Sequence, residues 1–314
     1  MDNSSQVLIN LFPVIALFVL GYLLRRIHFF ETGAVGALKK MVVNIALPAL
    51  LFRAFSSLTF KPQLLVVVVA VFSICILMVL AGRLIGRLLG IRNPYFALLM
   101  GGFETGMVGY AIFIAVYGVE NVPYLALVDL GQVLFVFFVL MSLLISLRGE
   151  KLSSIELARR LVSSPVIISI AAGLLFGLVK SHVAITDAGV YRAFDSLISI
   201  VGGLTMPLIC VVIGYELEID RATIGLPLAT IGIRTLLLVA LAFVMNALVI
   251  TRLLHLPPMY EKAVLTMFIL PPPFVIPLFM AQVDRENMRY VTNTLSVGTI
   301  ASAAVFFAIS VLVP

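Results

Sequence analysis

The chain has 314 residues, of which 62% are hydrophobic and only 11% are charged. Average soluble domains carry about 25% charged residues, so this composition excludes a soluble globular enzyme and equally a disordered chain, which would be poor in apolar residues. Two cysteines exclude a disulfide framework and a four-ligand structural zinc site, and we therefore expect an all-α polytopic membrane protein.

Ten apolar runs follow one another along the chain. A helix needs about 20 apolar residues to cross the hydrocarbon core of a bilayer. The runs are continuously apolar and lack the alternation of membrane-barrel strands, so we expect ten transmembrane helices. Numbered as spans 1 to 10, they cover residues 7–24, 33–55, 63–82, 93–119, 121–147, 161–179, 196–215, 222–251, 263–283 and 290–314.

Lysine and arginine are distributed unevenly over the linkers. The linkers after spans 1, 3, 5, 7 and 9 hold 14 of the 21 basic residues, and the opposite linkers hold 6. Positively charged linkers stay in the cytoplasm. We therefore expect a cell-membrane protein with both termini outside and with Arg148, Lys151, Arg159 and Arg160 inside. The same distribution accounts for the net charge of +6 without a nucleic-acid partner.

The chain divides into two halves of five spans. The first half covers residues 1–147, a cytoplasmic linker covers 148–163, and the second half covers 164–314. An odd number of spans in each half means that the second half enters the membrane inverted. We therefore predict two inverted five-helix repeats.

Weak internal similarity supports this division. Residues 47–50 of span 2 resemble residues 206–209 of span 7, and residues 120–124 before span 5 resemble residues 286–290 before span 10. Inverted repeats are typical of secondary transporters, in which the binding site lies near the membrane midplane between the repeats.

Spans 4 and 9 occupy the same place in each half, and both contain helix-breaking residues. Residues 100–110 of span 4 include four glycines around Glu104, and span 9 contains Pro271, Pro272 and Pro273. Consecutive prolines remove backbone donors and clash with the preceding turn. We predict that both helices are interrupted, which is the best sequence indicator of a transporter site. The alternative is a pair of packing kinks, since glycines also permit close helix contact.

Three segments resemble the auxin efflux carrier family, which includes bacterial malate and malonate permease-like members and is related to the plant PIN auxin exporters. Residues 40–52 match the family pattern Lys-x-x-x-Asn-x-x-Leu-Pro-x-x-x-Phe. At the two predicted breaks, the Thr-Gly and Gly-Tyr pairs within residues 105–110 and the Leu-Pro-Pro of residues 270–272 also match the family. The resemblance covers nearly the whole chain. It implies ten spans, crossing broken helices 4 and 9, elevator-type alternating access, a homodimer and usually a carboxylate substrate.

Two positions depart from the family pattern. Where the family commonly has Asn before Thr-Gly and Pro after Gly-Tyr, this sequence has Glu104 and Ala111. A fixed negative charge at the breaks would repel an organic anion, whereas a protonated Glu104 can donate a hydrogen bond as Asn does. Either Glu104 titrates and couples protons to transport, or it binds a cation, or its carboxyl is locked in an interhelical hydrogen bond.

The predicted substrate site combines the two breaks with polar residues of other spans. Asn44 lies four residues before Pro48, so its side chain can bond to backbone groups that the proline frees. The substrate-binding candidates are Asn44, Glu104, Thr105, Gly106, Gly109, Pro271, Pro272, Pro273 and Asn293.

Other intramembrane polar residues are candidates for coupling or supporting roles. Asp129 and Gln132 lie one turn apart on one face of span 5, and with Glu104 they are the coupling candidates. Lys40 and Arg234 supply supporting positive charge. Arg234 lies deep enough to need a partner. We favour an ion pair with Asp129 or Glu104, and the alternative is contact with a substrate carboxylate.

The function predicted from the sequence is secondary active transport of small organic anions, such as mono- or dicarboxylates. The alternatives are a cation-coupled symporter with the architecture of the bile-acid/sodium symporters, a channel, and an intramembrane enzyme. The histidines His28, His182 and His255 lie in linkers or at span ends, and HExxH and Walker motifs are absent. We therefore expect no catalysis, cofactor or metal. The expected partners are a small carboxylate, protons or sodium, membrane lipids and a second copy of the chain.

Overall fold

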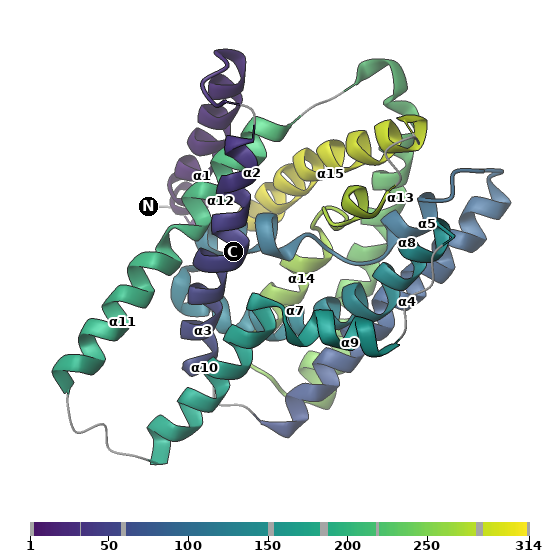
Figure 1. Ribbon diagram of the computed structural model, residues 1–314. Helices are drawn as coiled ribbons and strands as arrows, with labels where there is room; N and C mark the ends of the chain where they lie inside the picture. Colours follow the sequence, from purple (N-terminus) through teal and green to yellow (C-terminus); the bar gives the residue numbers. More distant parts are fainter. Residues whose placement is uncertain are drawn as a thin grey trace. The chain divides into compact units, whose positions relative to one another are not determined.

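The computed structural model describes residues 3–31, 33–57, 61–149, 154–182, 188–217, 220–280 and 285–312 (Figure 1). These residues form helices, and no strand occurs among them. The all-helical fold predicted from the composition is therefore confirmed. Lys151 lies outside the described residues.

Several of the helical segments are long and apolar enough to cross a membrane. Among the described residues six such segments are found, and a shorter apolar helix covers Pro165–Val179. The six are Ala34–Ser56, Pro62–Leu88, Phe96–Tyr117, Val119–Leu147, Gly189–Glu216 and Gly225–Leu253. The chain is a multi-pass membrane protein, and the count of ten spans stays a prediction.

The chain forms two compact units. Unit 1 comprises residues 1–62, 106–126 and 161–217, and unit 2 comprises residues 63–105, 127–160 and 218–314. Each unit therefore draws on both predicted halves of the chain. The repeat boundaries at 1–147 and 164–314 stay a prediction.

Unit 1 is built from helices of spans 1, 2, 4, 6 and 7. In chain order its elements are α1 (Asn3–Arg26), α2 (Ala34–Met41), η1 (Val42–Ala46), α3 (Leu47–Ser56), α6 (Tyr110–Tyr117), η4 (Val119–Asn121), α10 (Pro165–His182), α11 (Ala188–Gly203) and α12 (Thr205–Glu216). Helix α1 packs along α12, and α3 packs against α10 and α11.

Ion pairs connect helices within unit 1. Arg53 of α3 donates two hydrogen bonds to the carboxylate of Asp195 on α11, at 3.1 and 3.2 Å. The Lys39 ammonium of α2 lies 2.5 Å from the Glu216 carboxylate at the end of α12. These pairs are half-exposed, where an ion pair contributes about 0–1 kcal/mol. The apolar helix packing therefore supplies most of the stability of unit 1.

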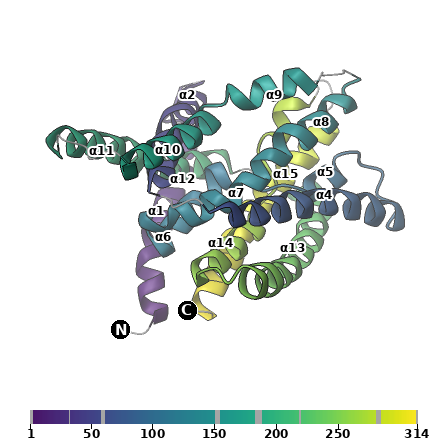
Figure 2. The same ribbon diagram turned by 90° about the horizontal axis from the view of Figure 1, so that it is seen from below.

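Unit 2 is built around α13, which packs against α14 and α15 (Figure 2). Its elements are η2 (Pro62–Leu64), α4 (Leu65–Leu88), α5 (Phe96–Met100), η5 (Val136–Leu140), α8 (Met141–Leu147), η6 (Arg221–Thr223), α13 (Gly225–Met245), η7 (Asn246–Leu253), α14 (Pro258–Phe268), η8 (Ile276–Phe279) and α15 (Arg285–Leu312). Four elements have residues in both units: η2, whose first residue belongs to unit 1, together with η3 (Thr105–Gly109), α7 (Val122–Phe135) and α9 (Ser154–Val162).

The core of unit 2 contains an unusual fully buried residue, Arg234 of α13. It is 1% exposed and is the largest of the fully buried side chains. Its guanidinium lies over the ring of Phe103, which in turn stacks on Phe268 with centroids 5.2 Å apart. An arginine is almost never buried without polar partners, so this position directs attention to the backbone around it.

Candidate functional site

Span 4 is interrupted at a glycine-rich segment. Helix α5 ends at Met100 and η3 begins at Thr105, so residues 101–104 are not helical. We call this segment the glycine break. Gly102 has φ +73°, and a Cβ atom there would lie 2.8 Å from Cγ of Pro273. Both the backbone conformation and the close approach require glycine.

Span 9 is interrupted at its prolines. Helix α14 ends at Phe268 and η8 begins at Ile276, so residues 269–275 lie outside a helix. We call this segment the proline break. Pro271, Pro272 and Pro273 are buried, and none of them has a backbone N–H group. The predicted interruption of both helices is therefore confirmed.

The two breaks meet through Glu104. Its backbone N–H donates to the Pro271 carbonyl at 2.9 Å. Its carboxylate accepts a hydrogen bond from the backbone N–H of Phe274, with 2.6 Å between Oε2 and N. Glu104 thus satisfies two backbone groups of the proline break: the Pro271 carbonyl as acceptor and the Phe274 N–H as donor. Unwound backbone at membrane depth needs such partners, because lipid supplies none.

Arg234 satisfies the carbonyls that both breaks leave open. Its guanidinium donates to the carbonyl oxygens of Leu99 at 3.1 Å, Met100 at 2.5 Å, Gly102 at 2.5 Å and Leu270 at 3.2 Å. A guanidinium has five N–H donors in a rigid fork, which suits several acceptors at once. The structure gives Arg234 these carbonyl partners in place of the ion pair expected from the sequence. The acceptors belong to the backbone of the interrupted helices, so the positions of charged residues in the sequence could not reveal them.

Two further side chains support the breaks and were missed by the sequence analysis. The guanidinium of Arg234 lies over the Phe103 ring, 5.2 Å from its centroid. Ser302 of α15 donates to the Ile269 carbonyl at 2.6 Å. A serine or phenylalanine in an apolar run carries no signal that distinguishes it from ordinary packing residues, so only the fold identifies them.

The predicted coupling residues of α7 are buried, and one of them contacts the glycine break. Asp129 and Gln132 are each 6% exposed. Gln132 donates through Nε2 to the Phe103 carbonyl at 2.7 Å. Gln132 Oε1 and Thr105 Oγ1 are buried and have no hydrogen-bond partner among the described residues. The structure therefore brings Glu104, Thr105, Gln132 and the prolines together within unit 2.

A family of membrane transport proteins matches residues 6–310. The chain belongs to this family. It comprises the membrane transport domain of the auxin efflux carriers, so the resemblance seen in the sequence is confirmed. No curated protein matches the chain.

Some residues carried over from the family pattern lie in unit 1. Asn44 is exposed and lies in η1, a π-helical turn, where its Nδ2 donates to the Lys40 carbonyl at 2.9 Å. Lys40 is exposed. Gly106 and Gly109 lie in η3, a second π-helical turn. Such turns often occur at functional sites. The roles of Asn44, Gly106 and Gly109 in substrate binding and of Lys40 as a supporting charge stay predictions.

Asn293 makes its hydrogen bonds away from the proline break. It is 2% exposed, and its Nδ2 donates to the Asp220 carbonyl at 3.0 Å while its Oδ1 accepts from the Asp220 N–H at 3.3 Å. These bonds hold the turn before α13. The assignment of Asn293 to the substrate site stays a prediction, and its observed contacts are those of a structural residue.

Asp220 itself is the centre of a polar cluster in this turn. The Arg289 guanidinium bonds its carboxylate, and the Ala222 N–H and the Thr223 hydroxyl also donate to it. These donors favour the charged form, so they hold the pKa of Asp220 below its usual range. Among the described residues, no group of three or more His, Cys, Asp or Glu side chains could hold a metal ion.

Proposed function

We propose that this transporter is a secondary active carrier of small organic anions with a carboxylate group. The observation that carries the proposal is the hydrogen bond from the Phe274 N–H to the Glu104 carboxylate at 2.6 Å. Phe274 supplies the first backbone donor after Pro271, Pro272 and Pro273. A backbone N–H group at a helix interruption can donate to an anion, and a hydrogen bond to a charged oxygen is stronger than one to a neutral oxygen.

The side chain of Glu104 occupies the position that a substrate carboxylate would take on Phe274. Both groups present carboxylate oxygens to the same donor, so they compete for it. A protonated Glu104 carries no charge and is a weaker acceptor. Protonation would therefore release the Phe274 N–H to the substrate, and a proton would enter with each bound anion. This exchange is the basis of the proton coupling that we propose.

Alternating access of the elevator type is the corresponding mechanism. The contacts divide the chain into two compact units, each containing segments of both predicted halves. The two breaks belong to unit 2. In the proposed mechanism unit 2 carries the bound solute while unit 1 stays fixed in the membrane.

A transport assay on the purified protein tests this function. A thermal-shift screen against mono- and dicarboxylates at two pH values identifies a bound anion, since binding to the native state raises the unfolding temperature. Counterflow of that anion in proteoliposomes then measures exchange. We expect exchange that is faster at acidic pH, and exchange whose pH dependence is lost in Glu104→Gln.

The matched control is Glu120→Gln, which neutralises an exposed carboxylate of unit 1. It should retain both exchange and its pH dependence. Unchanged pH dependence in Glu104→Gln would remove the coupling role, and chemical conversion of the anion would favour an enzyme. Flux down the gradient without exchange would favour a channel.

A cation-coupled symporter is a second candidate, and two buried oxygen atoms favour it. Thr105 Oγ1 and Gln132 Oε1 have no hydrogen-bond partner among the described residues. Buried polar atoms of this kind call for a bound water or ion, and hard cations prefer oxygen ligands. If sodium occupies them, sodium chloride raises the unfolding temperature more than choline chloride does, and Gln132→Leu abolishes the difference. An equal effect of both salts leaves the proton as the coupling ion.

We also propose a cell-membrane location with both termini outside, and a homodimer. The distribution of lysine and arginine over the linkers supports the orientation, and the family resemblance supports the dimer. Protease accessibility of epitope tags at each terminus of intact cells tests the orientation. Light scattering of the detergent-solubilised protein tests the dimer.

A further inference from the structure

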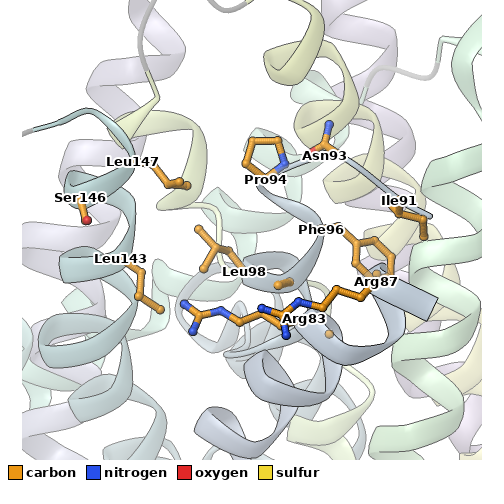
Figure 3. Close-up of a pocket in the computed structure, with 13 residues that line it drawn as sticks. Arg83, Arg87, Ile91, Asn93, Pro94, Phe96, Leu98, Leu143, Ser146 and Leu147 are labelled. Atoms are coloured by element: carbon orange, nitrogen blue, oxygen red, sulfur yellow. The ribbon is translucent and has the colours of Figure 1, made fainter. Parts of the chain in front are cut away.

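A hollow lies in unit 2, at the ends of α4 and α8 and apart from the two breaks (Figure 3). Its volume is about 370 Å³. Side chains of Arg83 and Arg87 lie along one side, and Leu143, Ser146 and Leu147 of α8 form another. The proposed transport function uses none of these residues.

The wall of this hollow is formed by a fixed turn after α4. The Ile91 N–H donates to the Gly86 carbonyl at 2.8 Å and the Gly90 N–H to the Arg87 carbonyl at 3.3 Å, and Gly90 has φ +67°. This is a Schellman motif, which satisfies the last carbonyls of the helix. The two arginine side chains are therefore not needed to cap the end of α4.

Asn93 fixes the following segment. Its Oδ1 accepts from the Tyr95 N–H at 2.9 Å, and its Nδ2 donates to Asn287 of α15 at 2.6 Å. Residues 90–95, some of which line the hollow, are therefore held at one end by the Schellman motif and at the other by the bonds of Asn93. A preorganised wall lowers the ordering cost of binding a ligand.

The charge in the hollow is strongly positive. Arg83 and Arg87 are exposed and lie four residues apart, on the same face of α4. Neither forms an ion pair with a residue that the structure describes. Like charges at this spacing destabilise a helix by a few tenths of a kcal/mol, so an anion between the two guanidinium groups would relieve the repulsion.

We propose that this hollow binds the phosphate group of an anionic phospholipid. Guanidinium groups bind phosphate oxygens bidentately, and the exposed hydroxyl of Ser146 offers a third donor. The apolar side chains Leu143 and Leu147 beside the arginines suit the glycerol and upper acyl region of a lipid. A free phosphate ion would gain nothing from these apolar side chains, so they favour a lipid as the ligand. Basic pockets between membrane helices are also the usual sites for lipid headgroups.

The test is an unfolding assay on the full-length protein in detergent. The only two cysteines of the sequence, Cys75 and Cys210, are free and buried, so a thiol-reactive fluorophore reports unfolding. The protein is titrated with phosphatidylglycerol, with phosphatidylcholine of the same acyl chains, and with inorganic phosphate. We expect phosphatidylglycerol to raise the unfolding temperature at concentrations where the other two have little effect.

Two double variants with equal loss of charge locate the site. Arg83→Gln with Arg87→Gln should weaken the apparent phosphatidylglycerol affinity by roughly tenfold or more, since a hydrogen bond to a charged group contributes about 1.5–3 kcal/mol. Arg92→Gln with Arg252→Gln removes exposed arginines that do not line the hollow, and should retain the affinity.

Three results would overturn the proposal. An equal loss in both double variants would show a general charge effect, an equal shift by phosphatidylcholine would show unspecific lipid binding, and an equal shift by inorganic phosphate would show a site for soluble anions. If the first double variant fails to fold, Arg83→Lys with Arg87→Lys keeps the charge and removes the bidentate geometry. It should still bind phosphatidylglycerol more weakly than the unaltered protein.

Discussion

The glycine break and the proline break interrupt two helices by opposite means. The glycine break keeps its N–H groups and gains conformational freedom and space, as Gly102 shows with its positive φ and its close approach to Pro273. The proline break loses three consecutive N–H groups and leaves carbonyls without their usual donors. Glu104 donates to one of these carbonyls, Arg234 to another and Ser302 to a third.

This difference shows how the two segments complement each other. One break supplies a backbone donor and a carboxylate, and the other supplies carbonyl acceptors and the Phe274 N–H. Neither segment could remain unwound at membrane depth alone, because each would leave buried polar groups unsatisfied. Four substitutions test this comparison, from the residue that both breaks share to a residue outside them.

Arg234→Met should have the largest effect, because Arg234 serves both breaks. The substitution leaves four buried carbonyls without their donor. Each unsatisfied buried group costs about 1–3 kcal/mol, so we expect a loss of stability on the order of 4 kcal/mol or more, measured as the unfolding temperature in detergent.

The control for this substitution is Arg252→Met, at an exposed arginine of η7, which should unfold near the temperature of the unaltered protein. Arg234→Lys keeps the charge without the planar fork and should lose less than Arg234→Met. An unaltered unfolding temperature for Arg234→Met would show that the carbonyl contacts contribute nothing.

Gly102→Ala tests the glycine break alone. The residue would be forced to keep φ +73° with its Cβ 2.8 Å from the Pro273 ring. A left-handed conformation costs a non-glycine residue roughly 1–2 kcal/mol, so we expect reduced stability and loss of counterflow activity. The matched control is Gly232→Ala in α13, where nothing lies within 4 Å of the added atom. If both variants behave alike, the positive φ is not required.

Ser302→Ala tests the proline break alone. It removes the donor to the Ile269 carbonyl, and a typical buried hydrogen bond contributes about 1 kcal/mol. We expect a small decrease in the unfolding temperature. Ser73→Ala is the comparison, since in the described part of the chain that hydroxyl bonds to the carbonyl of Val69 within its own helix. A larger loss in Ser73→Ala would contradict the assigned role of Ser302.

Asp220→Asn lies outside both breaks and should have the smallest effect. Because neighbouring donors lower the pKa of Asp220 in the folded state, its carboxylate stabilises the protein at neutral pH. This contribution is lost as the pH falls through that lowered pKa. The unfolding temperature of the unaltered protein should therefore fall more on acidification than that of Asp220→Asn. Parallel pH profiles would show that the cluster adds no stability.

The sequence predicted the helical class and the place of both interruptions, and it drew attention to Glu104 and Arg234, whose predicted roles in transport stay predictions. Glycines and prolines act on their own backbone, so their effect can be read from local sequence. The partner of Arg234 could not be predicted, because the carbonyls of Met100 and Leu270 become available only once the helices are interrupted and packed. The contact of Ser302 depends in the same way on the position of α15 beside the proline break.

The most direct test of the central claim is an electron cryo-microscopy map of the protein with the carboxylate that stabilises it most. We expect non-helical density at residues 101–104 and 269–275, with the carboxylate bound to the Phe274 N–H and the side chain of Glu104 displaced from it. Two continuous helices through these residues, or a carboxylate bound elsewhere while Glu104 still holds Phe274, would contradict it.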